Sequence, residues 1–363
     1  EHCLRFQGHT CTACQDACPF GAIDYEAQEE TVALQVGAIV LATGFDLLDP
    51  ARVFECYGKA KNVYTGLELE RLLNSSGPSE GKIVLSGERT PGKIALIHCV
   101  GSRTPRFNEY CSGVCCTYLA KFSRQLLKKC PGATITHFFS ELCFPEKRAQ
   151  PFFDEVSAET AVECVRLKSV DSVHIVDQEG KTFIRYVDVH GRSGSVAFDM
   201  VVLASAMEGV SDADEVARVF DVSLGTGRFF EPEHAVVAPV SSMREGVFVV
   251  GCAQGPKDVQ ASAVQGQAAA GRILSKLLPG EKLALEATVC EVDEALCSGC
   301  KTCMGSCKYK AMDFDGERSC VQVNKVLCRG CGTCAASCPS GAIKADHYTD
   351  EQVFSEIEGL LNT

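Results

Sequence analysis

The sequence lacks several features that would place it in common functional classes. None of its apolar runs approaches the ~20 unbroken residues of a membrane span, so we expect no direct span. Residues 1–20 are polar and cysteine-rich, so no signal peptide is expected there. Positive charge is in the minority, with 35 Lys and Arg against 47 Asp and Glu, and the net charge of −12 argues against nucleic acid as a partner.

The sequence also lacks GxGxxG, the glycine-rich turn that binds a dinucleotide pyrophosphate. We therefore expect no complete dinucleotide site from this chain alone. The sequence contains no Ser/His/Asp set and no paired carboxylates at a telling position, so it gives no sign of group-transfer chemistry. The histidines are scattered, and none has an assignable role.

Cysteine, by contrast, is abundant, with 23 residues that cluster at short spacings. Disulfide scaffolds are usually short and secreted, whereas this chain has 363 residues and is acidic. The cysteines therefore predict thiolate ligands for metal in a cytoplasmic, reducing setting.

Two C-terminal runs, 297–307 and 328–339, both read C-x2-C-x2-C-x3-C. In bacterial ferredoxins the first three cysteines of such a run bind one 4Fe–4S cluster and the fourth crosses to the other. Zinc is the alternative, but zinc needs neither a third cysteine per run nor a following proline. We assign one cluster to Cys297, Cys300, Cys303 and Cys338, and the other to Cys328, Cys331, Cys334 and Cys307.

The N-terminal end predicts a further 4Fe–4S cluster on Cys3, Cys11, Cys14 and Cys18, since Cys18-Pro19 matches the end of a ferredoxin run. The fourth ligand, Cys3, has an alternative, which is a residue supplied from elsewhere. A chain that opens almost inside a motif is expected to be a fragment or one part of a split protein.

Two apolar strands that run into glycine turns predict parts of a cofactor site. Residues 37–45 end in Ala-Thr-Gly-Phe, and residues 246–258 lead into an alanine-rich helix at 261–278, whose N-terminus can face phosphate or a flavin edge. Each segment alone also fits an ordinary α/β turn. Together they resemble the later FAD-binding segments of two-dinucleotide-domain flavoproteins, with candidate residues Ala42, Thr43, Gly44, Gly251, Cys252, Ala253, Gln254, Lys257 and Asp258.

A second α/β unit lies between these segments. Strands are predicted at 93–103 and 200–205, and the first enters a turn where an NAD(P) domain would have its glycines. Cys99 stands there instead, followed by Cys111, Cys115 and Cys116. This substitution suggests that nicotinamide binding has been replaced by a cysteine-rich function, with a buried cysteine patch or a redox dithiol as alternatives to a cluster.

Five segments carry a family resemblance: Ala-Thr-Gly-Phe at 42–45, Cys-Val-Gly-Ser-Arg at 99–103, Tyr-Cys-Ser-Gly-Val-Cys-Cys at 110–116, Gly-Cys-Ala-Gln-Gly-Pro-Lys-Asp at 251–258 and the closing ferredoxin run. Together they resemble the A subunit of heterodisulfide reductase. The resemblance covers essentially the whole chain, but the family's N-terminal part, with its first flavin glycine motif, is absent.

The resemblance implies an α/β fold with a thioredoxin-reductase-like, two-dinucleotide-binding flavoprotein core and ferredoxin-like (α+β) 4Fe–4S modules at both ends. It implies that Cys99, Cys111, Cys115 and Cys116 bind a fourth cluster. It also places Lys121 at the flavin ring, where a cation stabilises reduced flavin; a surface lysine on a helix from 118 to 129 is the alternative. Glu68 matches family sequence with an open role.

We expect six segments along the chain: an N-terminal single-cluster segment (1–30), an FAD-domain segment (31–90), an NAD-domain-like unit with the cysteine cluster (91–205), a C-terminal FAD-domain segment (206–284), a two-cluster ferredoxin domain (285–345) and a C-terminal helix (346–363).

The implied function is that of an oxidoreductase subunit that passes electrons between FAD and 4Fe–4S clusters, with flavin-based bifurcation as one form. Expected partners are a donor module such as a hydrogenase or formate dehydrogenase, a heterodisulfide-reductase-like or quinone-linked acceptor, ferredoxin, and a chain that supplies the missing FAD segment. Two alternatives stand beside it: a flavin-free iron–sulfur wire or scaffold, and an NAD(P)H-dependent flavin reductase.

Overall fold

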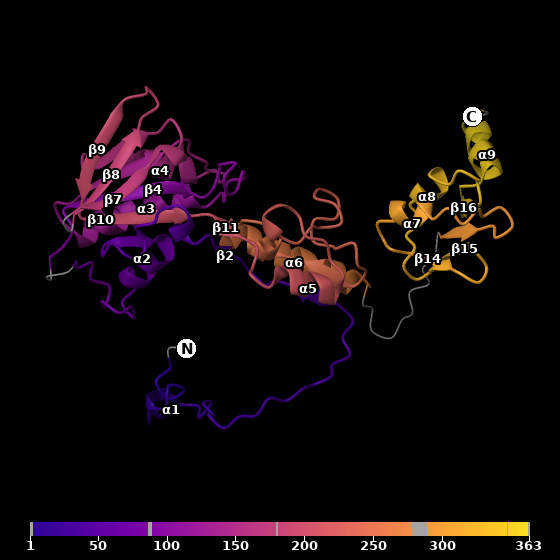
Figure 1. Cartoon of the computed structure of the whole chain (residues 1–363), viewed down its shortest axis with the longest axis horizontal. Coiled ribbons are helices and arrows are strands. Elements are labelled where there is room, and N and C mark those ends of the chain that lie inside the picture. Colours follow the sequence, from indigo (N-terminus) through magenta and orange to yellow (C-terminus); the bar gives the residue numbers. More distant parts are fainter. Residues whose placement is uncertain (1–2, 86–88, 179–180, 277–288, 347, 362–363) are drawn as a thin grey trace. The chain divides into compact units, whose positions relative to one another are not determined.

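The computed structural model describes residues 3–85, 89–178, 181–276, 289–346 and 348–361 (Figure 1). The chain divides into two compact units, Glu1–Gly37 and Ala38–Thr363. Among its described residues the first unit contains one short helix, α1 (Ala13–Ala17), and the rest is turns and irregular backbone. Its Arg5 guanidinium stacks 4.2 Å from the centre of the Tyr25 ring.

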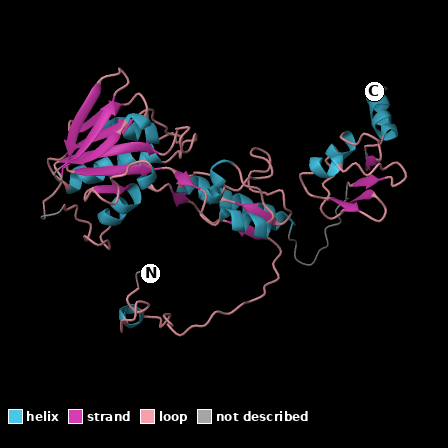
Figure 2. Cartoon of the chain, in the orientation of Figure 1, coloured by secondary structure: helices cyan, strands magenta, loops and turns pink. Residues whose placement is uncertain are grey.

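The second unit contains a five-stranded parallel sheet (Figure 2). Its central strands are runs of apolar residues, as expected of parallel strands that are covered on both faces. In spatial order the strands are β3 (Val63–Thr65), β10 (Met200–Ser205), β4 (Lys93–Val100), β5 (Thr134–Phe139) and β6 (Val162–Arg166).

Alternation along the strands divides the core into two layers. Ile94 and Leu96 face one layer, which also contains apolar side chains of the three helices, and Ala95 and Ile97 face the other, which contains side chains of a small antiparallel sheet. The helices are α2 (Gly66–Leu73), α3 (Cys115–Lys129) and α4 (Ala149–Ser157), and the sheet strands are β7 (His174–Gln178), β8 (Lys181–Val187) and β9 (Ser193–Phe198).

The two segments predicted to serve a flavin lie next to each other although they are far apart in the sequence. β1 (Ile39–Leu41) pairs in parallel with β12 (Val247–Val249), and Leu41 and Val249 share a small core with Phe230. The surrounding elements are β2 (Asp46–Leu47), β11 (Met207–Glu208), α5 (Ala213–Phe220) and α6 (Val259–Lys276).

Each cysteine run near the C-terminus contains a short helix and is followed by a short strand. β13 (Cys290–Val292) pairs with β16 (Ile343–Ala345), and β14 (Met312–Asp315) pairs with β15 (Cys320–Val323). The helices are α7 (Thr302–Ser306), α8 (Thr333–Ala336) and α9 (Asp350–Leu361). Single 3-10 turns elsewhere are η1 (Pro50–Arg52), η2 (Val170–Ser172), η3 (Thr226–Arg228) and η4 (Gly251–Ala253).

The α/β class is confirmed, and the strand expected at 200–205 has those bounds. The helix expected at 118–129 begins one turn earlier, at Cys115, because the preceding cysteines join it. The helix expected at 261–278 spans Val259–Lys276 in the structure. Its last two expected residues, and the expected boundary between 284 and 285, lie outside the described residues. Within the described ranges, no helix is long and apolar enough to cross a membrane.

Candidate functional site

The carboxyl edge of the parallel sheet brings together four of the predicted ligands. Cys99 lies at the end of β4 and adopts a left-handed backbone conformation, with φ of 56°, which is costly for a residue other than glycine. Cys111 lies in the following loop, and Cys115 and Cys116 open α3. Glycine would adopt this conformation at lower cost, so the cysteine at position 99 indicates that its thiol is needed there.

These thiols lie close enough to interact electrostatically. Burial raises the pKa of Cys99, and the neighbouring Cys115, Cys116 and Cys111 add to that rise. Burial likewise raises the pKa of Cys115 to about 12 and that of Cys116 to about 11. Such a group is stable as thiolates only when a cation compensates their charge, and the N-terminus of α3 supplies part of that compensation.

A fifth cysteine, Cys143, belongs to the same group. Cys143 stands apart from the other cysteines in the sequence, and core packing is the default expectation for such a cysteine, but the structure places it beside Cys116 and Cys111. Its backbone N–H donates to Cys116 Sγ at 3.5 Å, and its thiol hydrogen-bonds with Cys111. No local pattern could have indicated this contact, because Cys143 follows β5 and reaches the group only through the pairing of β4 with β5.

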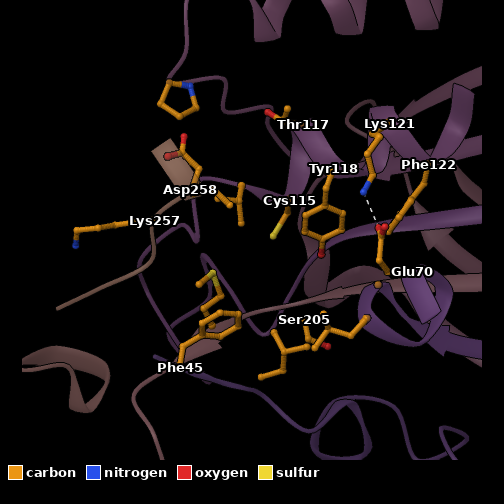
Figure 3. Close-up of a pocket in the computed structure, with 18 of the residues that line it drawn as sticks. Phe45, Glu70, Cys115, Thr117, Tyr118, Lys121, Phe122, Ser205, Lys257 and Asp258 are labelled. Carbon is orange, nitrogen blue, oxygen red and sulfur yellow. Dashed lines mark hydrogen bonds and ion pairs between the residues drawn. The ribbon is translucent and has the colours of Figure 1, made fainter. Parts of the chain in front are cut away.

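A cavity of about 590 Å³ adjoins the cysteine group (Figure 3). This volume is typical of a site for a small molecule or part of a cofactor. Its wall is mostly apolar and includes Phe45, Tyr118, Phe122 and Phe152. Cys115 is part of the same wall, so the cavity and the cysteine group share a side chain.

Lys121 lines this cavity and is paired there. Its Nζ lies 2.5 Å from Glu70 Oε2, and Figure 3 shows this pair on the opposite side of the cavity from Lys257 and Asp258. Both side chains of the pair are about half exposed, at 44% and 50%. The structure therefore places Lys121 at the cavity as an ion pair with Glu70, and its part in catalysis stays a prediction.

Glu68, whose role the sequence left open, lies outside the cavity lining and caps α2. Its carboxylate accepts from the Thr65 backbone N–H at 2.6 Å, while Thr65 Oγ1 accepts from the Glu68 N–H at 3.2 Å. This is a capping box. Tyr57 also donates to Glu68, at 3.0 Å, so the residue serves the helix terminus.

Ser205, at the carboxyl end of β10, was not anticipated as a site residue. It is 2% exposed and lines the cavity, and its hydroxyl has no hydrogen-bond partner among the described residues. Buried hydroxyls without partners are rare because desolvation costs about 1–3 kcal/mol. The orphaned hydroxyl therefore indicates a bound group with a polar atom at this wall.

Among the nine predicted flavin residues, Lys257 and Asp258 line the cavity. The other seven lie in the turns that support it, and Gly44 and Gly251 have φ of 83° and 63°. The Gly251 backbone N–H donates to Gln265 Oε1 at 2.8 Å, and Gln265 Nε2 donates to Gln254 Oε1 at 2.7 Å. These contacts fix the second turn to α6. The roles of Ala42, Thr43, Gly44, Gly251, Cys252, Ala253 and Gln254 in cofactor binding stay predictions.

The C-terminal cysteines lie near one another across the two runs, and their assignment to two clusters stays a prediction. Four of them line one small cavity, and they are the predicted ligands Cys297, Cys300, Cys303 and Cys338. In the other set burial raises the pKa of Cys334, and Cys328 and Cys307 are near enough to raise it further. The Ala311 N–H donates to Cys307 Sγ at 3.3 Å. The fourth cysteine of each run is thus beside the other run, as crossed ligation requires.

The N-terminal cysteines form a looser group in their own unit. Burial raises the pKa of the Tyr25 hydroxyl, and the nearby Cys14, Cys11 and Cys3 raise it further. Cys18 Sγ accepts from the Ala22 N–H at 3.3 Å. A cluster on these cysteines stays a prediction.

Within the described ranges, no three Cys, His, Asp or Glu side chains converge closely enough to hold a single metal ion. This finding does not bear on an iron–sulfur cube, because each thiolate there binds a different iron and the sulfurs stand farther apart.

Comparison with known proteins places a 4Fe-4S binding domain at residues 321–344, which contain the second cysteine run. The chain as a whole is similar to an iron-sulfur A subunit of the CoB--CoM heterodisulfide reductase of Methanopyrus kandleri, with 38% identity over 94% of this chain and 52% of that protein. It is 34% identical to the A subunit of the H(2):CoB-CoM heterodisulfide,ferredoxin reductase of Methanothermobacter thermautotrophicus, over 100% of this chain and 54% of that protein.

Among solved structures, the thioredoxin reductase of T. acidophilum is similar to this chain with a TM-score of 0.42 and 12% identity, over 66% of this chain and 65% of that one.

The fold and the cysteine runs thus define an α/β iron–sulfur protein with a C-terminal 4Fe–4S domain. More particularly, the chain is a homologue of the A subunits of heterodisulfide reductase, at about 35% identity over most of its length. It spans about half the length of the relatives that it matches.

Proposed function

We propose that this chain is an electron-transfer subunit of a heterodisulfide-reductase-like oxidoreductase, in which electrons pass between FAD in the 590 Å³ cavity and 4Fe–4S clusters. The observation that carries the proposal is the position of Cys115. This residue belongs to the group of close cysteines and also forms part of the cavity wall. A flavin and a cluster would therefore be separated by little more than one side chain.

The cavity suits the ring system of a flavin. Its aromatic walls match a flat, apolar ring, and the orphaned Ser205 hydroxyl matches a polar atom at the ring edge. FAD, when bound, exchanges electrons in pairs with one partner and singly with clusters. The pyrophosphate half of FAD has no glycine turn in this chain, so another segment or chain would supply that part of the site.

The residues around the cavity would orient the cofactor and set its electrostatics. Tyr118 hydrogen-bonds with Cys115, and both residues are part of the cavity wall. Lys121 and Glu70 place a cation and an anion together at one side of the cavity, so the carboxylate weakens the positive potential of the lysine there. Burial lowers the pKa of Lys257, although nearby Cys252 partly offsets this effect.

The thiol groups would hold four clusters, on the N-terminal set, the set of 99–116 and the two crossed C-terminal sets. The arrangement in the last two sets supports this proposal best, since their cysteines already surround a cavity or each other. For the set at 99–116, the structure offers five cysteines for four ligand positions, and Cys143 provides a backbone donor to Cys116.

Partners are implied by the chemistry, because a chain that only relays electrons needs a donor and an acceptor. The names of relatives mention H(2) and ferredoxin in one case and F(420)H(2) in another. We extend this to the present chain as a donor module such as a hydrogenase and an acceptor such as ferredoxin. Flavin-based bifurcation, in which one electron goes to each of two acceptors, is part of the proposal.

The test is the iron, acid-labile sulfide and flavin content per chain, measured without oxygen on the protein with its co-purifying partners. We expect about sixteen irons from four clusters and one FAD. The Cys331→Ser and Cys115→Ser variants should each lose about four irons. Cys164→Ser is the matched control, because Cys164 is exposed on β6 and has no predicted ligand role.

Other outcomes select the alternatives. Full iron without flavin in the intact complex makes the chain an iron–sulfur wire, for which the missing GxGxxG is the supporting observation. Direct reduction of the purified protein by NAD(P)H would favour a flavin reductase. A Cys115→Ser variant with unchanged iron would remove the cluster at 99–116 from the proposal.

A further inference from the structure

Three buried polar side chains form a hydrogen-bonded chain that ends on Cys116. His98 Nδ1 lies 3.5 Å from Cys116 Sγ, and His98 Nε2 lies 2.9 Å from His137 Nδ1. His137 Nε2 lies 2.8 Å from Ser123 Oγ. His98, His137 and Ser123 are each 0% exposed, so the chain is closed off from water.

The sequence produces this arrangement through two periodicities. In β4, His98 follows Ile94 and Leu96 on the face that packs against α3, and the register of β4 with β5 places His137 opposite Leu96. In α3, Ser123 lies seven residues, or about two turns, after Cys116, so both point toward the sheet. The contacts are therefore a consequence of strand pairing and helix packing, and no local motif signals them.

When Cys116 binds a metal, only one placement of the protons satisfies all the hydrogen bonds between Cys116, His98, His137 and Ser123. His98 and His137 are fully buried, and burial disfavours a charged side chain, so each imidazole is neutral with one donor nitrogen and one acceptor nitrogen. A thiolate has no proton, so the contact with His98 Nδ1 must be donated by the imidazole.

The rest of the arrangement follows in order. With its proton on Nδ1, His98 accepts at Nε2 from the Nδ1–H of His137, and His137 accepts at Nε2 from the Ser123 hydroxyl. The hydroxyl has a second acceptor within reach, the Leu119 carbonyl at 3.1 Å, but the contact with His137 is shorter at 2.8 Å. Each of the three contacts then has one donor and one acceptor, without any buried charge on the imidazoles.

We propose that His98 is a positioning residue that donates a hydrogen bond from Nδ1 to Cys116 Sγ, and that His137 and Ser123 fix the tautomer that makes this donation possible. The inference rests on the proposed cluster at 99–116. Hydrogen bonds to ligand sulfurs raise the reduction potential of an iron–sulfur cluster, because they stabilise the extra negative charge of the reduced state. His98 would thus make the cluster beside the cavity easier to reduce.

The test is an EPR-monitored redox titration of the anaerobically purified complex, with iron content measured on the same samples. His98→Leu removes the donor and should shift the midpoint potential of this cluster to a more negative value. His98→Asn places an amide N–H near the position of Nδ1 and should restore part of the shift. Ser123→Ala should shift the potential in the same direction by a smaller amount, and His174→Leu is the control because His174 is exposed on β7.

A second measurement needs no substitution. Pulsed EPR of wild-type protein with 15N-labelled histidine should show a coupling between the reduced cluster and a histidine nitrogen, which His98→Asn abolishes. Full iron with no 15N coupling, or with a potential that Ser123→Ala and His98→Leu leave unmoved, would overturn the inference while the proposed function stands. If the wild-type protein itself lacks the EPR signal and the iron of this cluster, the cluster at 99–116 does not exist, and the inference fails with it.

Discussion

Ser205 provides a sharp test of the cavity, because its replacement should have opposite effects on the empty and the loaded protein. In the flavin-free protein its buried hydroxyl has no partner within the described part of the chain, and such a group costs about 1–3 kcal/mol of desolvation. Ser205→Ala removes that cost along with a small amount of packing. We expect the free energy of unfolding to rise by about 1 kcal/mol.

In the loaded protein the same hydroxyl would hydrogen-bond with the flavin ring. Loss of about 1 kcal/mol of binding free energy corresponds to roughly fivefold weaker binding. Riboflavin is a suitable probe, because it carries the ring without the pyrophosphate for which this chain has no glycine turn. Urea unfolding followed by circular dichroism gives the stability, and a fluorescence titration gives the affinity.

Ser242→Ala is the matched control, since Ser242 is also buried but its hydroxyl has partners. Ser242 Oγ lies 2.8 Å from the Val247 carbonyl and accepts from the Arg244 N–H at 3.1 Å. This variant should lose about 1–2 kcal/mol of stability. If Ser205→Ala destabilised the flavin-free protein as much as the control does, the hydroxyl would be satisfied without a ligand, and the reasoning would fail.

Further predictions concern the ion pair, a helix cap and pH. Glu70→Gln leaves Lys121 as an unpaired cation at the cavity, so the flavin potential should rise in a spectroelectrochemical titration while urea stability changes by less than about 1 kcal/mol. Thr65→Ala removes the N-cap of α2 and should cost about 1 kcal/mol in urea unfolding without changing iron content. In iron-free protein Cys115 and Cys116 have pKa values raised to about 12 and about 11, whereas unfolded thiols titrate near ~8.5. The unfolded chain then loses protons first, so stability should fall as pH rises from about 8.5 to 12, and a denaturation series over that range checks the sign.

Local patterns predicted the parts of this protein whose chemistry is repeated along the chain. The spacing of the cysteines within each run was enough to predict cluster binding. The family match at 321–344 confirms a 4Fe–4S domain at the second run. The strand-and-glycine segments at 37–45 and 246–258 were expected to serve one site, and β1 and β12 do pair. In these cases the residues that determine the structure are neighbours in the sequence.

Contacts that depend on strand register were not predictable in this way. Cys143 reaches Cys116 from the loop after β5, and His98 meets His137 across two strands. Ser205 was expected only as the end of a strand, but its importance comes from a missing partner, which only a three-dimensional structure reveals. Sequence spacing assigns ligands within a motif, whereas tertiary pairing decides what surrounds them.

The adjacent pair Cys115 and Cys116 illustrates how these two levels combine. Consecutive residues of an α-helix point about 100° apart, so the two thiols share the cysteine group but differ in their other neighbours. Cys115 lines the cavity, and Cys116 contacts His98 and the backbone of Cys143. An adjacent pair of cysteines at the start of α3 therefore gives one thiol to the cavity and the other to the buried hydrogen-bonded chain. If both bind the proposed cluster, one helix turn connects the flavin cavity to the groups that would tune the cluster's potential, and a substitution on either side should be detectable from the other.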